Sequence, residues 1–123
     1  MADTYRVLAV DGSEFARKVV ASSLADSEFE LVDCVAGGED AVGRFKELEP
    51  DLILLDIVLP QQNGLEALKQ ILAHDPEARV VMVSSLGTDD AVTECLREGA
   101  KLFIQKPYEK GDLLAALRHA LTA

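Results

Sequence analysis

The sequence predicts an α/β domain in which five parallel strands form one sheet with helices on both faces. Three observations support this fold class. Strand-like and helix-like segments alternate five times, two of the strand-like segments are apolar at every position, and the connections between segments are short. Strands that are apolar throughout are typically buried on both faces, and parallel strands need crossover connections, which are usually helical. A doubly wound sheet meets both conditions.

The first two strand–helix units occupy the N-terminal half of the chain. A β-branched segment over residues 5–10 ends at the turn residues 11–13. The helix expected over residues 14–25 has apolar residues at helical spacing: Phe15, Val19, Val20 and Leu24. The second strand is expected over residues 29–36. The helix over residues 39–48 that follows ends before Pro50, because a proline cannot continue the helical hydrogen bonds.

The remaining three units continue the same pattern. Strands are expected over residues 52–55, 80–83 and 101–105. The helix after the third strand follows a loop at residues 60–64. Thr88 is a predicted cap for the next helix, which ends at Gly99, and the last helix begins at about Glu109.

Length and charge exclude several classes of protein. The 123 residues fit one domain, residues 1–123, and the net charge of −10 argues against binding of nucleic acid or of anionic lipid. No segment is long and apolar enough for membrane insertion, and no signal peptide opens the chain, so a cytoplasmic location is expected. Cys34 and Cys95 lack metal or redox spacing and are expected in the core of a protein in a reducing compartment.

Four polar residues directly follow apolar strands: Asp11, Asp56, Ser84 and Lys106. Ligands of open α/β sheets bind at the carboxyl ends of the strands, so these side chains are the candidate site. Asp11 alone could be a helix cap, Ser84 could bond a backbone carbonyl, and Lys106 could be a surface charge. Asp56 is harder to explain structurally, because apolar residues surround it on both sides, and such a carboxylate usually has a partner or a function.

These residues carry a family resemblance. The segment 51–56, ending in Asp56, together with Pro60 and Asn63-Gly64, resembles the phosphoacceptor segment of bacterial response-regulator receiver domains. Ser84 and Lys106-Pro107 match the remaining signature positions. The resemblance covers the whole chain and is greatest to stand-alone members that act in chemotaxis. It implies a flavodoxin-like (βα)5 sheet with strand order 2-1-3-4-5 and a cis peptide bond before Pro107.

The resemblance also implies a role for each residue. Asp56, ionised at an ordinary pKa of about 3.9, would accept a phosphoryl group from a sensor histidine kinase or a phosphotransfer protein. Lys106 would supply an ammonium group and Ser84 a hydroxyl bond to the phosphoryl group, and Phe103 would be the aromatic switch, although it could equally be an ordinary core residue. The protein would be a switch that assists its own phosphorylation and dephosphorylation rather than an enzyme. A downstream target would bind around the fourth helix, fifth strand and fifth helix.

One departure from the family concerns the metal. Family members usually have two adjacent acids after the first strand, whereas this chain has Asp11 and Gly12. Mg²⁺ would be held by Asp11, Asp56 and the Val58 carbonyl, because it prefers oxygen ligands and often takes one or two carboxylates. Its affinity would be lower than usual, because Gly12 supplies no carboxylate. Glu14 is a less favoured substitute for the missing acid. The alternative is a pseudo-receiver that acts by protein binding without phosphorylation.

Three further expectations concern the lifetime of the phosphoryl group and two classes of protein that the residues disfavour. Val58 and Leu86 occupy the positions that flank the phosphoryl group, and neither can orient an attacking water, so self-dephosphorylation is expected to be slow. A flavin-binding electron carrier would need a hydroxyl-rich phosphate loop and aromatic residues to cover the flavin, but Asp11 and Glu14 place negative charge in that loop and there is no Trp. A hydrolase is disfavoured because His74 and His119 lie in predicted helices, away from the strand ends.

Overall fold

The computed structural model describes residues 4–60, 63–85 and 87–122, and in them strands and helices alternate as the sequence predicts. Helix and strand bounds equal the predicted ones or differ from them by one residue. The strands are β1 Tyr5–Val10, β2 Phe29–Val35, β3 Leu52–Asp56, β4 Val80–Ser84 and β5 Leu102–Gln105. The helices are α1 Glu14–Leu24, α2 Gly38–Leu48, α3 Gly64–His74, α4 Asp89–Glu98 and α5 Lys110–Thr122.

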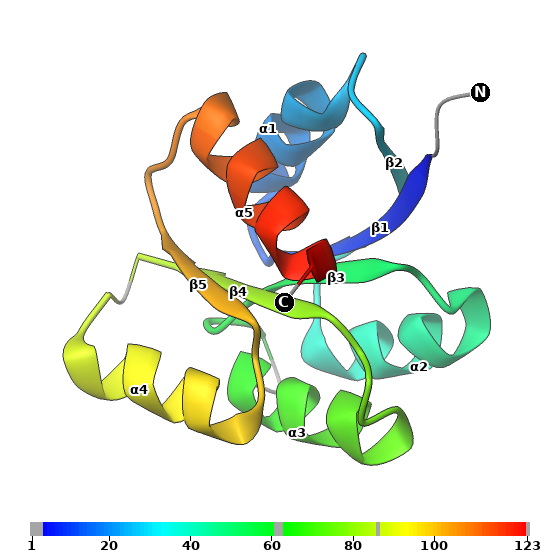
Figure 1. Ribbon diagram of the computed structural model, residues 1–123. Helices are drawn as coiled ribbons and strands as arrows, with labels where there is room; N and C mark the ends of the chain where they lie inside the picture. The colour runs from blue at the N-terminus through cyan, green and yellow to red at the C-terminus, as the bar shows by residue number, and fades with distance from the viewer. Residues whose placement is uncertain (1–3, 61–62, 86, 123) are drawn as a thin grey trace.

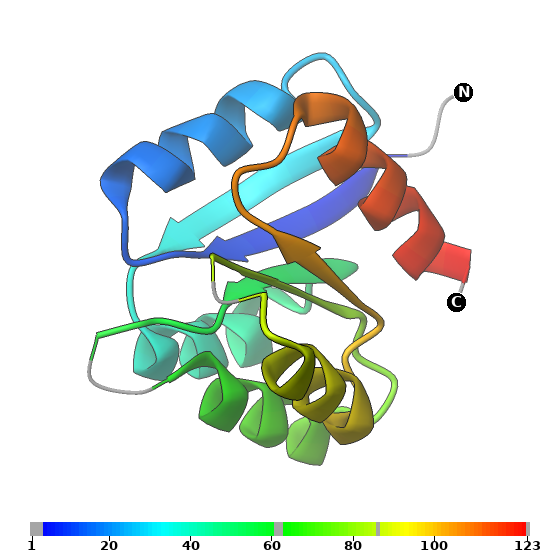
Figure 2. The same ribbon diagram turned by 90° about the vertical axis from the view of Figure 1, so that its left-hand side faces the viewer.

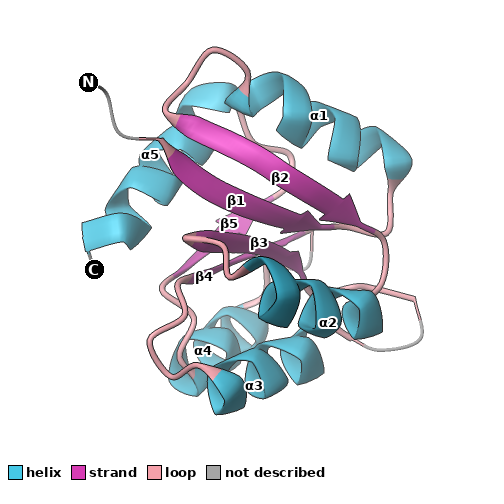
Figure 3. Cartoon of the chain, turned by 90° about the vertical axis from the view of Figure 1, so that its right-hand side faces the viewer, coloured by secondary structure: helices cyan, strands magenta, loops and turns pink. Residues whose placement is uncertain are grey.

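The five strands form one parallel sheet in the order β2-β1-β3-β4-β5, which confirms the predicted fold class and strand order. Helices α1 and α5 cover one face, and α2, α3 and α4 cover the other (Figures 1 and 3). The chain places β2 on one side of β1 and β3 on the other, so β1 and β3 lie at the point where the winding direction reverses. Ligands of doubly wound sheets bind at this point.

Each face of the sheet carries its own apolar core, and Figure 2 shows the helices of the two layers on opposite sides of the strands. Every residue of β3 and of β4 is buried, which explains why their sequences are almost entirely apolar. Large side chains that are fully buried come from both layers: Leu8, Leu52, Ile53, Leu55, Leu68, Ile71, Met82, Leu113 and Leu117. The two cores hold the strand ends in fixed register.

One apolar position of α1 is exposed, and one core expectation needs correction. Phe15 is 77% exposed, because the helical face that packs on the sheet is formed by Val20 and Leu24 further along α1. Cys34 is only half-buried, although Cys95 is buried as predicted. Within the described part of the chain, no helix is long and apolar enough to cross a membrane.

Candidate functional site

The two carboxylates of the candidate site lie side by side at the carboxyl end of the sheet. Val10 of β1 pairs with Leu55 of β3, so Asp11 and Asp56 follow at the same level on neighbouring strands. Each residue is only 6% exposed. The structure thus brings together two acids that are 45 residues apart in the sequence, as the strand-end argument predicts.

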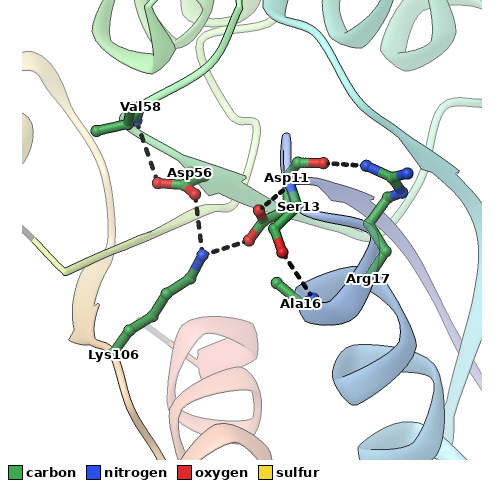
Figure 4. A network of polar contacts seen from close by, with 7 residues as sticks. All are labelled: Asp11, Ser13, Ala16, Arg17, Asp56, Val58 and Lys106. Atoms are coloured by element: carbon green, nitrogen blue, oxygen red, sulfur yellow. Dashed lines mark hydrogen bonds and ion pairs between the residues drawn. The ribbon is translucent and has the colours of Figure 1, made fainter.

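Lys106 joins these two carboxylates (Figure 4). Its Nζ lies 2.5 Å from Oδ2 of Asp11 and 3.0 Å from Oδ2 of Asp56. The lysine follows β5, and its peptide bond to Pro107 is cis, as expected. One ammonium group therefore serves two largely buried carboxylates.

The pKa values of Lys106 and Asp56 reflect the fact that one ammonium group serves two carboxylates. Burial lowers the pKa of Lys106, but hydrogen bonds from its ammonium group to Asp11 and Asp56 outweigh that effect, and the net pKa is raised. Burial raises the pKa of Asp56, and the opposing bond from Lys106 does not cancel the rise. The expectation of an ordinary pKa for Asp56 is therefore wrong, because the pKa is raised. The sequence did not show how deeply this carboxylate is buried. The site carries negative charge that its one ammonium group does not balance.

Asp11 is held by the loop that leads into α1, and it is not the cap of that helix. Ser13 caps α1 by accepting a hydrogen bond from the backbone of Ala16. The Ser13 backbone N–H donates to Oδ1 of Asp11 at 2.9 Å, and Nη1 of Arg17 donates to the Asp11 backbone carbonyl at 2.7 Å (Figure 4). Both the carboxylate and the carbonyl of Asp11 are thereby fixed.

The residues around Asp11 bear on the metal expectation. Glu14 points away from the site, since its carboxylate pairs with Lys18 at 3.5 Å and both side chains are about three-quarters exposed. A Cβ atom on Gly12 would lie 4.0 Å from the Val58 carbonyl oxygen and 3.1 Å from Cδ of Pro60. A side chain at residue 12 would therefore begin 4.0 Å from one expected metal ligand, the Val58 carbonyl oxygen, whereas the Glu14 carboxylate is exposed and paired with Lys18.

The oxygen donors present suit a hard cation. Asp11 and Asp56 supply carboxylates, and Val58 supplies a nearby carbonyl. Mg²⁺ is commonly held by one or two carboxylates and several waters, and the unbalanced charge of Asp56 favours a cation. Among the described residues, no group of three acidic, histidine or cysteine side chains is suited to hold a metal ion. The residues fit a divalent cation with few protein ligands.

The remaining predicted residues surround this centre. Ser84 is fully buried at the end of β4, and its backbone carbonyl accepts a hydrogen bond from the Lys106 N–H at 3.0 Å. Phe103 is half-buried against the core on the side of α2, α3 and α4. Val58 is 57% exposed, and its backbone N–H donates to Oδ1 of Asp56 at 3.1 Å. Leu86 lies outside the described residues.

Sequence reasoning missed a cavity beside the candidate site. A cavity of about 480 Å³ opens beside the site between α1 and the loop after β5. Its lining is mostly apolar: Ser13, Phe15, Ala16, Val19, Ser85, Lys106, Pro107 and Tyr108. Phe15 shares the helical spacing of Val19, Val20 and Leu24, and that spacing alone does not show that its ring is exposed beside this cavity. His74 and His119 lie in α3 and α5, as predicted.

Comparisons with known proteins agree with this geometry. Residues 7–118 match the family described as the response regulator receiver domain. The chain is 41% identical to the chemotaxis protein CheY of Listeria monocytogenes over 115 residues, which cover 94% of this chain and 97% of the relative. It is 37% identical to the chemotaxis protein CheY of Bacillus subtilis, with 95% and 98% covered.

Solved structures show the same likeness. A chain of the CheX–CheY–BeF3–Mg²⁺ complex from Borrelia burgdorferi superposes with a TM-score of 0.90 at 36% identity, covering 94% of this chain and 87% of the other. The response regulator domain of CheB from Thermotoga maritima gives a TM-score of 0.90 at 37% identity, with 98% of each chain covered. The likeness therefore extends over the whole fold.

Proposed function

Because this chain belongs to the response regulator receiver domain family, we propose that Asp56 accepts a phosphoryl group and thereby switches a protein-binding surface in a phosphorelay. One observation carries the proposal. Two buried carboxylates at the carboxyl ends of adjacent strands share a single ammonium group, that of Lys106. Two carboxylates that share one ammonium group are suited to receive a cation and a phosphoryl group, which supports the proposal.

The proposed transfer is a displacement at phosphorus. A carboxylate oxygen of Asp56 attacks the phosphorus of a phosphohistidine, the O–P bond forms, and the N–P bond breaks. The imidazole leaves with the electron pair of that bond and takes up a proton, and Asp56 becomes an acyl phosphate. Lys106 neutralises charge on the phosphoryl oxygens, and Ser84 donates its hydroxyl to one of them. Burial keeps water away from the reacting atoms.

Asp11, Asp56 and the Val58 carbonyl are proposed to hold Mg²⁺, which would neutralise and align the phosphoryl oxygens. The affinity should be lower than in relatives with a second acid, because Gly12 contributes no carboxylate. Gly12→Asp should tighten Mg²⁺ binding, measured by calorimetric titration, after Pro60 shifts by a few tenths of an ångström to admit the new side chain. Gly43→Asp adds the same charge in open space on α2 and should leave the affinity unchanged. Equal affinity in the Gly12 variant and wild type would remove residue 12 from the metal site.

Intact mass measurement with a small phosphodonor tests the chemistry. Wild type should gain one phosphoryl group in saturating Mg²⁺, and Asp56→Ala should gain none. The same adduct on both proteins would move the acceptor to another residue. No adduct on wild type at any Mg²⁺ concentration would favour the alternative, in which the chain is a phosphorylation-independent interaction module.

The lifetime of the acyl phosphate is a second property of this site. Val58 is exposed beside Asp56 and offers no polar group to orient an attacking water. Self-dephosphorylation is therefore proposed to be slow. Val58→Asn and Leu86→Glu should each shorten the half-life of the adduct, followed by mass over time. Unchanged half-lives in both variants would contradict this part of the proposal.

The donor is proposed to be a sensor histidine kinase or a phosphotransfer protein, and the output a downstream target protein. The similarity to chemotaxis proteins supports a role in chemotaxis. Phosphorylation is proposed to draw Ser84 toward the phosphoryl group and to change the packing of Phe103, and so to alter the surface of α4, β5 and α5. Backbone NMR signals of that surface should shift on phosphorylation, and the shifts should be absent in Asp56→Ala.

A further inference from the structure

Arg17 connects helix α1 to the end of strand β1. Its side chain reaches back from the start of the helix, and Nη1 donates to the Asp11 backbone carbonyl at 2.7 Å in a partly buried hydrogen bond (Figure 4). The Arg17 backbone N–H donates to the Ser13 carbonyl at 3.0 Å. That backbone bond belongs to the first turn of α1, so it is the Arg17 side chain that links the helix to Asp11.

The charge of Arg17 is not used in an ion pair. Arg44 and Arg118 each pair with a carboxylate, whereas Arg17 has no ion pair within the residues that the structure describes. Burial raises the pKa of the Cys34 thiol, and the positive charge of Arg17 opposes that rise. The guanidinium group of Arg17 therefore binds the backbone carbonyl directly after β1, beside the candidate site.

Asp11 is also held from outside α1, because Nζ of Lys106 lies 2.5 Å from its Oδ2 and its backbone N–H donates to the Val35 carbonyl at 3.0 Å. Asp11 is followed by Gly12, which has no Cβ and therefore a wider range of backbone conformations than any other residue. Two contacts from the α1 side restrain the loop: the Ser13 N–H on the Asp11 carboxylate and the Arg17 guanidinium on the Asp11 carbonyl. A site with only one acid at the end of β1 depends on the placement of that acid.

We propose that Arg17 is a positioning residue, which holds Asp11 in the orientation that binds Mg²⁺. The inference rests on the proposed function, in which Asp11 is a metal ligand. Contacts that orient metal ligands from outside commonly change metal affinity by about 10- to 100-fold when they are removed. Arg17 acts in this way through the backbone of Asp11 and touches neither the metal nor the phosphoryl group.

Arg17 affects Mg²⁺ affinity in two opposite ways, through its positive charge and through its contact with Asp11. A positive charge near a cation site repels the metal, so removing the charge alone would tighten Mg²⁺ binding. Removing a positioning contact would weaken it. The direction of the change in affinity therefore separates positioning from a simple charge effect.

The experiment is a Mg²⁺ titration of the full chain followed by NMR. The Ser13 N–H donates to the Asp11 carboxylate and the Val58 N–H donates to the Asp56 carboxylate, so their amide signals report on each acid separately. Arg17→Ala should weaken Mg²⁺ binding about tenfold and should shift the metal-free signal of Ser13 more than that of Val58. Arg17→Lys keeps a charged donor with a shorter reach and should lose about threefold.

Arg118→Ala is the matched control, because it removes the same charge from an exposed ion pair with Glu28, which precedes β2 at the opposite end of the sheet. Its Mg²⁺ affinity should equal that of wild type. Unchanged or tighter binding in Arg17→Ala would overturn the inference. If that variant does not fold, wild-type affinity in Arg17→Lys would overturn it. A wild type that binds no Mg²⁺ would overturn both this inference and the metal part of the proposed function.

Discussion

Two carboxylates at opposite ends of the sheet both pair with a cation, yet their pKa values move in opposite directions. Glu28, before β2, accepts hydrogen bonds from Nε and Nη2 of Arg118 at 2.7 and 2.9 Å. These bonds, with a contribution from the Glu28 backbone, lower its pKa to about 2. Asp56 accepts a hydrogen bond from Lys106 at 3.0 Å, and burial nevertheless raises its pKa.

The difference comes from burial and from how many acids share the cation. Glu28 lies at the surface and has a guanidinium group to itself. Asp56 is 6% exposed and shares one ammonium group with Asp11. The charges of Glu28 and Arg118 cancel each other, whereas the two carboxylates of the strand-end site exceed the one positive charge of Lys106. This surplus distinguishes the candidate functional site from a structural ion pair and favours the binding of a divalent cation.

The largest expected effect comes from removing the shared ammonium group. Lys106→Met leaves two buried carboxylates without a counter-charge, and the free energy of unfolding should fall by about 3 kcal/mol, at the low end for a broken buried pair because the lysine is partly exposed. Urea unfolding at pH 7 in a chelator measures this. Added Mg²⁺ should restore part of the loss. A loss no larger than that of Arg118→Met would mean that the two ends of the sheet do not differ.

A smaller effect of opposite sign is expected from removing one of the two acids. Asp56→Asn keeps an oxygen that can accept the Val58 N–H and removes the unbalanced charge. In the absence of metal at pH 7 it should stabilise the chain by about 1 kcal/mol, measured by urea unfolding. A lower free energy of unfolding for Asp56→Asn than for wild type would contradict the surplus of negative charge at the site.

The pH dependence of that stabilisation has a defined sign. The folded-state pKa of Asp56 is raised, so the folded chain binds this proton more tightly than the unfolded chain does. The resulting stability is complete below the ordinary carboxyl pKa of about 4 and is lost as the pH rises through the folded-state value. The advantage of Asp56→Asn over wild type should therefore shrink as the pH falls toward 4. An advantage that grows toward acid would contradict the raised pKa.

The smallest effect is expected at the exposed pair. The lowered pKa of Glu28 means that its contribution is present above its unfolded value and is lost as the pH falls through about 2. Arg118→Met should lower the urea midpoint slightly at pH 6, and the difference should fade toward pH 2 and in high salt. A midpoint shift as large as that of Lys106→Met would contradict the distinction between the pairs.

The fold could be predicted because its signals are local. Apolar strands, caps such as Thr88 and terminators such as Gly99 each occupy a few residues, and the positive φ of 116° at Gly99 shows why glycine ends α4. The strand order followed from the family resemblance, since residue patterns alone allowed more than one doubly wound order. Strand ends then placed Asp11 and Asp56 correctly.

What the sequence could not give depends on distances between segments far apart in the chain. Helical spacing does not show that Phe15 is exposed. Position in the sequence did not show that Glu14 turns outward to Lys18, and nothing local indicated that Lys106 contacts two acids rather than one. The raised pKa of Asp56 follows from that sharing and from burial. These contacts and the burial determine the pKa of Asp56, which therefore could not be predicted from the sequence.

The most direct measurement is the titration of the Asp56 carboxyl group itself, followed by carbon NMR of its side chain with and without Mg²⁺. Without metal, the carboxyl group should titrate above its ordinary range, because burial outweighs the single shared ammonium group. With saturating Mg²⁺, the same carboxyl group should titrate at lower pH, since the cation supplies the missing positive charge. A metal-free pKa at or below the ordinary value, or one that Mg²⁺ leaves unchanged, would contradict the proposed cation-dependent phosphoacceptor site.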